Sequence, residues 1–150
     1  NFRMAALRHR SKGLRVGTTA EFSRSVADQV ATLGMGLEDK LQQPMGALSG
    51  GQRQALTLLM TVMAPIEVLL LDEPSAALDP RSARDVMEQA ARIIGEHRIT
   101  ALLVTHNIHE ALRYGNRLIQ LENGRLVRDY RDEDKQQLDH TEVVSWFDYY

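Results

Sequence analysis

Two short apolar runs on either side of one amphipathic helix constrain the fold of this chain more than any other feature. The runs Val68–Leu71 and Ala101–Val104 contain no polar position, which is the pattern of strands buried on both faces of a parallel sheet. Between them, Asp79 and Pro80 supply an N-cap and a first-turn proline. Apolar residues then recur at helical spacing: Ala83, Val86, Met87, Ala90, Ile93 and Ile94. This order predicts a βαβ unit, whose ligands gather at the carboxyl ends of the strands.

Two further helices are predicted before this unit. Thr18 and Glu21 have the spacing of a capping box, and the apolar residues that follow predict a helix over Ala20–Leu33, which Gly34 closes. A second helical pattern covers Arg53–Met63, has a glycine-rich start and is stopped by Pro65.

After the βαβ unit the sequence predicts smaller elements. A short helix is expected over Ile108–Arg113, followed by a hairpin with a type I′ turn at Asn123 and Gly124. Beyond it, Arg131–Lys135 alternates charges, and Thr141–Tyr150 is expected to form a short helix. The apolar face of that helix would consist of Val143, Val144, Trp146 and Phe147.

The composition excludes several classes of protein. With 150 residues, 43% hydrophobic and 25% charged, the chain has the content of one globular unit. A net charge of -2 argues against binding nucleic acid by wholesale phosphate neutralisation, although basic residues are concentrated in the first two dozen positions. The absence of cysteine excludes disulfides and thiolate metal sites. No apolar run approaches the ~18 residues of a membrane span.

Leu48–Gln52 is a candidate phosphate site, because Ser49, Gly50 and Gly51 precede a helix. Glycines let the backbone approach a ligand closely, and a helix start offers unpaired N–H groups and the positive end of the helix dipole. The same three residues also suit a flexible turn before a helix, so this motif is weak when taken alone.

Acidic residues and one histidine follow the two predicted strands. Asp72 and Glu73 come after the first strand and His106 after the second. A carboxylate in this position can hold a divalent cation, and its neighbour can deprotonate an attacking water. The histidine can hydrogen-bond a γ-phosphate. Each residue has an ordinary alternative role, as a strand end or a solvated side chain.

In this order the motifs Leu48–Gln52, Leu70–Pro74, Ala77–Asp79 and Thr105–His106 resemble the ATP-binding cassette (ABC) family. The resemblance implies an α/β fold like that of P-loop NTPases, with a parallel sheet, flanking helices and part of the helical signature subdomain. It covers about residues 33–127. The sequence of this stretch, including Asn107 where many members have Asp, is similar to sequences of the tryptophan/tyrosine-type amino-acid uptake branch.

Site residues follow from the resemblance. It implies that Ser49, Gly50, Gly51 and Gln52 are the signature motif, which binds nucleotide held by a second cassette. It implies that Asp72 is the Walker B carboxylate for Mg²⁺, that Glu73 is the catalytic base and that His106 is the switch histidine. Ser75 and Asp79 would belong to the D-loop, and ATP and Mg²⁺ would be the cofactors.

Part of the family pattern is missing. None of the three lysines, Lys12, Lys40 and Lys135, follows the glycines of a phosphate loop, and the Gln-containing loop is absent. We therefore expect an incomplete fold, the C-terminal portion of a cassette, which does not hydrolyse ATP by itself. Expected divisions are residues 1–54 for the partial helical subdomain, 55–130 for the ATPase core and 131–150 for a tail.

The resemblance also implies partners and a location. We expect the ATPase subunit of a membrane transporter, most simply an importer, on the cytoplasmic face of the plasma membrane. Its partners would be a second cassette domain in a head-to-tail dimer, a permease and a substrate-binding protein, with no nucleic acid. Two alternatives remain open: a soluble cassette ATPase acting on DNA or ribosomes, and a degenerate cassette that only dimerises or regulates.

Overall fold

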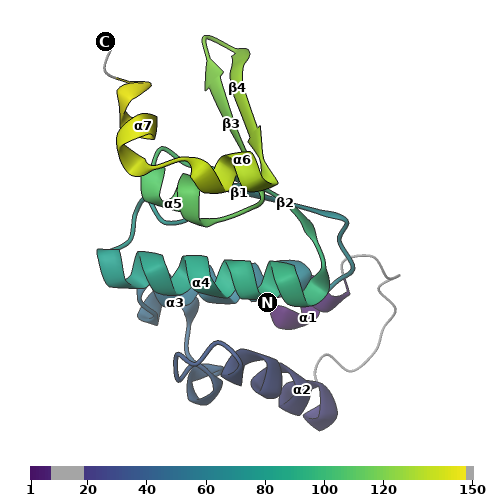
Figure 1. The fold of residues 1–150 in the computed structure, drawn as a ribbon. Helices are drawn as coiled ribbons and strands as arrows, with labels where there is room; N and C mark the ends of the chain where they lie inside the picture. The colour runs from purple at the N-terminus through teal and green to yellow at the C-terminus, as the bar shows by residue number, and fades with distance from the viewer. Residues whose placement is uncertain (8–18, 148–150) are drawn as a thin grey trace. The chain divides into compact units, whose positions relative to one another are not determined.

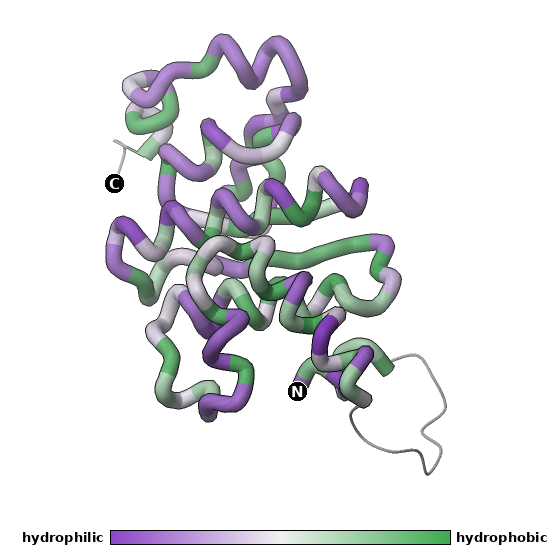
Figure 2. The backbone as a smooth tube through the Cα atoms, turned by 90° about the horizontal axis from the view of Figure 1, so that it is seen from below, coloured by the Kyte–Doolittle hydropathy of each residue, from purple (hydrophilic) through white to green (hydrophobic). Residues whose placement is uncertain are grey.

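The computed structural model describes residues 1–7 and 19–147, which fall into two compact units (Figure 1). The first unit comprises Asn1–Leu69 and Pro74–Thr100, and the second comprises Leu70–Glu73 and Ala101–Tyr150. Hydrophilic and hydrophobic stretches alternate along the trace, as expected for amphipathic elements (Figure 2). Among the described residues, no helix has both the length and the apolar character needed to cross a membrane.

The first unit is helical. Its elements are α1 (Phe2–Ala6), α2 (Ala20–Ala31), η1 (Glu38–Lys40), η2 (Met45–Ala47), α3 (Gly50–Val62) and α4 (Pro80–His97). Helices α3 and α4 pack against each other. The buried apolar residues of these two helices include Ala55, Leu58, Leu59, Val86, Ala90 and Ile93.

Helix α2 confirms the predicted helix and its start at Ala20, but its C-terminal end differs. The N-cap is Thr19, whose hydroxyl accepts a hydrogen bond from the Phe22 N–H at 3.1 Å. The predicted cap, Thr18, lies outside the described residues. The helix ends at Ala31 rather than Leu33. Gly34 then adopts a φ of +64°, which is the left-handed turn that glycine permits at no steric cost.

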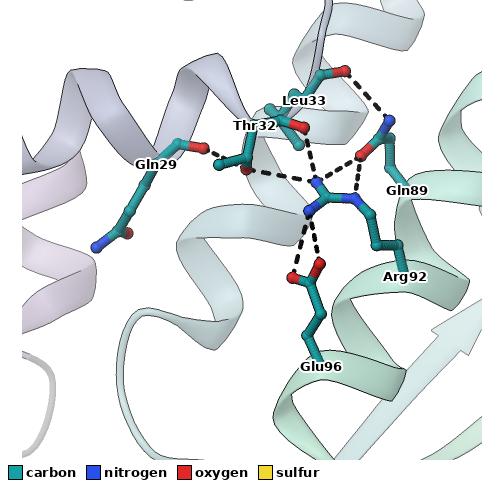
Figure 3. A network of polar contacts seen from close by, with 6 residues as sticks. All are labelled: Gln29, Thr32, Leu33, Gln89, Arg92 and Glu96. Atoms are coloured by element: carbon teal, nitrogen blue, oxygen red, sulfur yellow. Dashed lines mark hydrogen bonds and ion pairs between the residues drawn. The ribbon is translucent and has the colours of Figure 1, made fainter.

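Helix α4 holds the C-terminal end of α2 through polar side chains (Figure 3). Arg92 donates from Nη2 to the Thr32 carbonyl at 2.9 Å, and Gln89 donates from Nε2 to the Leu33 carbonyl at 3.1 Å. Glu96 pairs with Arg92 at 3.0 Å. These bonds satisfy carbonyl groups that the end of a helix leaves without partners.

Helix α3 begins three residues earlier than predicted, at Gly50 instead of Arg53. The reason is a strong cap at Ser49, described with the site below. Helix α4 begins as predicted, with Asp79 as the N-cap and Pro80 in the first turn. It ends before Arg98, which adopts a left-handed φ of 51°.

The second unit contains strands and short helices. Strand β1 (Val68–Asp72), most of which belongs to this unit, pairs with β2 (Thr100–Val104) in a parallel sheet. The following elements are α5 (Ile108–Arg113), β3 (Arg117–Glu122), β4 (Arg125–Arg131), α6 (Asp132–Gln137) and α7 (His140–Ser145). Both predicted strands and the short helix at Ile108–Arg113 are therefore confirmed.

Burial of the first sheet differs from the prediction. Leu69 is buried, but Val68 is 55% exposed and Leu70 is 69% exposed. Leu102 and Val104 on β2 are exposed as well. The expectation of strands buried on both faces is wrong for the described residues, because a sheet of two strands leaves these apolar side chains uncovered.

The predicted hairpin is confirmed. Asn123 and Gly124 have φ values of 49° and 73°, and positive φ at both central residues is the requirement of a type I′ turn. Strands β3 and β4 pair antiparallel, with a register irregularity between Gln120 and Leu121 that the sequence did not predict.

The C-terminal segment is more helical than predicted. The charged stretch after β4 forms helix α6, which contacts both strands of the hairpin. Helix α7 confirms a helix near the predicted position, but it starts one residue earlier and ends at Ser145, before Trp146 and Phe147. Residues 148–150 lie outside the described part. Val143 is buried, Trp146 stacks on Tyr130 with ring centroids 5.5 Å apart, and Phe147 stays exposed.

Candidate functional site

The predicted signature residues form a capping box at the start of α3. The Ser49 hydroxyl accepts a hydrogen bond from the Gln52 N–H at 3.2 Å, and the Gln52 side chain accepts one from the Ser49 N–H at 3.2 Å. The Ser49 hydroxyl therefore accepts a hydrogen bond inside the helix start. Of the four N–H groups that a helix start leaves unpaired, the box uses two and leaves those of Gly50 and Gly51.

The two glycines permit close packing inside the first unit. A Cβ atom on Gly51 would lie 2.9 Å from the Cβ of Ser82, and one on Gly50 would lie 3.0 Å from the Cδ2 of Leu78. The start of α3 therefore lies directly against Leu78 and the first turn of α4. Close packing inside the unit is thus a reason for these glycines beyond the approach of a ligand or the flexible turn that the sequence indicates.

Asp79 of the predicted D-loop caps α4. Its Oδ1 accepts hydrogen bonds from the N–H groups of Arg81 and Ser82, both at 3.1 Å. Hydrogen bonds from the Ser82 side chain and backbone lower the pKa of Asp79, with a smaller contribution from the Arg81 N–H. Ser75 lies one turn earlier, where its carbonyl accepts from the Leu78 N–H at 3.1 Å.

Asp72 and Glu73 lie where β1 ends, in the second unit. Asp72 is the last residue of the strand and is exposed. Glu73 adopts a φ of 43°, an uncommon left-handed conformation for a residue with a side chain. Its N–H donates to the Val104 carbonyl of β2 at 2.9 Å, which ties the turn to the end of the neighbouring strand.

Glu73 and His106 meet at the carboxyl ends of the paired strands. The distance from His106 Nδ1 to Glu73 Oε1 is 2.9 Å. The side chains are 75% exposed for His106 and 45% exposed for Glu73. The structure thus brings together the predicted base and the predicted switch histidine, on an accessible surface.

Hydrogen bonds also fix the backbone on both sides of His106, through residues that the sequence analysis did not single out for a role. Thr105 donates from its hydroxyl to Glu110 Oε2 at 2.8 Å and accepts from the Asn107 N–H at 3.0 Å. Asn107 caps α5 by accepting from the N–H groups of His109 and Glu110. The spacing of Asn107 and Glu110, that of a capping box, could have pointed to them.

Only Asp72 was predicted to hold a metal, and its chemistry suits Mg²⁺. This ion prefers hard oxygen ligands and is commonly bound through one or two carboxylates together with water and substrate phosphates. Within residues 1–7 and 19–147, no group of three or more acidic, histidine or cysteine side chains could enclose a metal ion. Asp72 would hold such an ion together with water and phosphate oxygens.

The described residues have the α/β fold of solved ATP-binding cassettes. A family model described as ABC transporter matches residues 3–76. The tyrosine transport ATP-binding protein of Clostridioides difficile is 49% identical over 102 residues, which cover 68% of this chain and 41% of that protein. These matches confirm the resemblance to the ABC transporter family that the motifs of this chain indicate.

A second relative points to the same family. The aliphatic sulfonates import ATP-binding protein SsuB 1 of Paraburkholderia xenovorans is 41% identical over 95 residues, which cover 63% of this chain and 28% of that protein. The chain thus spans less than half the length of these two relatives.

Solved structures support the fold. The ATP-binding cassette MJ1267 of an ABC transporter superimposes with a TM-score of 0.74 at 19% identity, covering 97% of this chain and 60% of the cassette. A nucleotide-free ATP-binding cassette from an ABC transporter gives a TM-score of 0.71 at 20% identity, covering 96% of this chain and 57% of that one.

Proposed function

We propose that this chain serves in the ATP-binding and ATP-hydrolysing subunit of an ABC-type importer. The observation that carries the proposal is the contact between Glu73 and His106, at 2.9 Å, beside Asp72 at the ends of two paired strands. A base, a second polar group and a cation-binding carboxylate at neighbouring strand ends suit the hydrolysis of the phosphoanhydride bond to a γ-phosphate. The relative named for aliphatic sulfonates import supports the direction of transport.

Each residue has a role in this proposal. Glu73 accepts a proton from the attacking water, because its carboxylate is exposed at the strand end. His106 engages Glu73 through Nδ1, which leaves Nε2 for an oxygen of the γ-phosphate. Asp72 would hold Mg²⁺ together with water and phosphate oxygens, and the bound ion neutralises phosphate charge.

The start of α3 binds the nucleotide of a second cassette in this proposal. Gly50 and Gly51 keep N–H groups that the capping box does not use and that can donate to a phosphate at the positive end of the helix dipole. Ser49 and Gln52 hold the turn in shape, and Ser75 and Asp79 order the segment that packs beside it.

The working assembly in this proposal is a head-to-tail pair of cassettes on a permease, at the cytoplasmic face of the membrane. A substrate-binding protein would deliver the cargo. The tyrosine transport relative makes an aromatic amino acid the first cargo to test.

A chimera tests the proposed function without assuming the limits of the natural protein. The aligned 102 residues of the C. difficile tyrosine transport ATP-binding protein are replaced with those of this chain, and phosphate release is measured with Mg²⁺ and ATP. We expect turnover in the usual enzymatic range of roughly 1 to 10³ per second. A folded chimera that binds ATP without releasing phosphate would instead support the degenerate cassette.

A further inference from the structure

Glu110 is a buried carboxylate to which none of the roles above has been assigned. It lies in α5 and is 7% exposed. Burying a carboxylate is unfavourable unless hydrogen bonds compensate for the lost water, so a residue of this type in this position calls for a specific partner. One such partner is the Thr105 hydroxyl, which donates to Glu110 Oε2 at 2.8 Å.

The hydrogen bonds of Thr105 enclose His106. Its hydroxyl oxygen accepts from the N–H of Asn107, the residue after His106, at 3.0 Å, while the same hydroxyl donates to Glu110. The Thr105 side chain therefore links the residue before His106 to Asn107, the residue after it. Because the Glu110 carboxylate can only accept from this hydroxyl when ionised, it also fixes the direction of the hydroxyl proton.

The His106 ring depends on its backbone for orientation. At 75% exposed, the ring has little packing to restrict its rotamers, and ordering an exposed side chain costs conformational entropy. Its partner Glu73 is tied through its N–H to the Val104 carbonyl. A fixed path from Val104 through Thr105 thus determines whether Nδ1 and Oε1 lie within hydrogen-bond distance.

We infer that Glu110 is a positioning residue for His106, acting through the Thr105 hydroxyl. Its carboxylate holds the turn at residues 105–107 in the shape that directs the imidazole towards Glu73. That His106 acts on a nucleotide rests on the proposed function, whereas the contact that Glu110 controls exists in the chain without nucleotide.

A different role for Glu110 would be purely local. An acidic residue in the first turn stabilises a helix through the helix dipole, and this effect would need no bond to Thr105. The two roles differ in what rescues them. Glu110→Gln keeps an oxygen that accepts from Thr105 but loses the charge, and Thr105→Ser keeps the hydroxyl.

The test is the nuclear magnetic resonance signature of the His106 ring nitrogens in the ¹⁵N-labelled 150-residue chain, at constant pH and without nucleotide. The His106→Gln variant assigns the signals, and Glu73→Ala gives their positions when the partner is removed. We expect Thr105→Val and Glu110→Ala to shift the signals at least halfway to the Glu73→Ala positions. Thr105→Ser and Glu110→Gln should stay near wild type, as should Glu133→Ala, which removes an exposed acid of α6.

The outcomes separate the alternatives. If Glu110→Ala and Thr105→Val both leave the His106 signals unchanged, or if Glu110→Gln shifts them as far as Glu110→Ala does, the inference is overturned. If Glu110→Ala shows no cooperative unfolding transition and is therefore not folded, the shift of the His106 signals in Thr105→Val alone decides the test. Failure of the proposed function would appear instead as missing phosphate release from the chimera, with these ring signals unaffected.

Discussion

Backbone strain at the residue scale coincides with the candidate catalytic position. Glu73 has a φ of 43°, and a non-glycine residue held in such a region costs about 1–3 kcal/mol. Two contacts hold it there: its N–H to Val104 and its carboxylate to His106. The positive φ of Glu73 turns the chain directly after Asp72, the last residue of β1. The carboxylate of Glu73 then contacts His106.

Gly51 gives a prediction about packing. Replacement of glycine by alanine inside a helix normally stabilises by about 0.5–1 kcal/mol, but a methyl group here would lie 2.9 Å from the Ser82 Cβ, an atom close to the backbone. We expect Gly51→Ala to lower the free energy of unfolding by about 1–3 kcal/mol, measured by urea titration. Gly46→Ala is the control, since a Cβ there meets nothing within 4 Å. A Gly51→Ala variant as stable as wild type would refute the close packing.

Some residues of the candidate site could be predicted from the sequence and others could not, for a physical reason. Asp72, Glu73 and His106 could be placed because strand ends follow from a local apolar pattern. The bond from Thr105 to Glu110 could not, since it depends on how the backbone turns between them. Likewise, the capping box at Ser49 lets α3 begin at Gly50. The pattern of apolar residues begins later and predicted a start at Arg53.

At the scale of elements, tertiary contacts stabilise helix α6, where the sequence indicated only a charged stretch. Asp132 begins it with a φ of 43°, and its N–H donates to the Asn116 carbonyl at 2.7 Å. Lys135 is buried and donates to the carbonyls of Tyr114 and Gly115 at 2.6 and 2.7 Å. The three carbonyls that accept these bonds lie on the loop between α5 and β3. Sequence periodicity could not reveal such contacts.

The hairpin gives a prediction about pH. Hydrogen bonds from Arg117, across the strands, lower the pKa of Asp129 from 3.8 to about 2. Since the folded pKa is lower than the unfolded one, Asp129 contributes stability above pH 3.8 that is lost as pH falls through about 2. Asp129→Asn should therefore be less stable than wild type at neutral pH, with the difference shrinking across that window. Urea midpoints of both proteins measure it, and a difference that is constant with pH would contradict the expectation.

For the molecule as a whole, the exposed strand face is the clearest departure from the sequence pattern. The apolar runs at Val68 and Ala101 correctly predicted two paired strands. Their burial was predicted wrongly because unbroken apolar runs are typical of sheets with both faces covered. The chain covers 60% of a whole cassette structure, and its two-stranded sheet leaves Leu70 and Val104 exposed.

This face gives a prediction about self-association. Exposed apolar strands recruit other chains, so we expect the 150-residue chain to associate as its concentration rises. Leu70→Thr should raise the monomer fraction in size-exclusion chromatography with light scattering and change the free energy of unfolding by no more than about 0.5 kcal/mol. Leu70→Ile, which keeps the apolar surface, serves as the control. Equal association of all three proteins would show that this face is not the cause.

Glu73 is the residue on which the proposed mechanism depends most. In the chimera with the C. difficile relative, Glu73→Gln preserves the shape of the side chain but removes the basic carboxylate. Glu67→Gln is the matched control, because Glu67 is an exposed acid just before the same strand. We expect Glu73→Gln to keep ATP binding and to lower steady-state phosphate release by about 10²–10⁴, while Glu67→Gln stays close to the unmodified chimera. A Glu73→Gln chimera that retains more than half of the phosphate release would show that Glu73 is not the base.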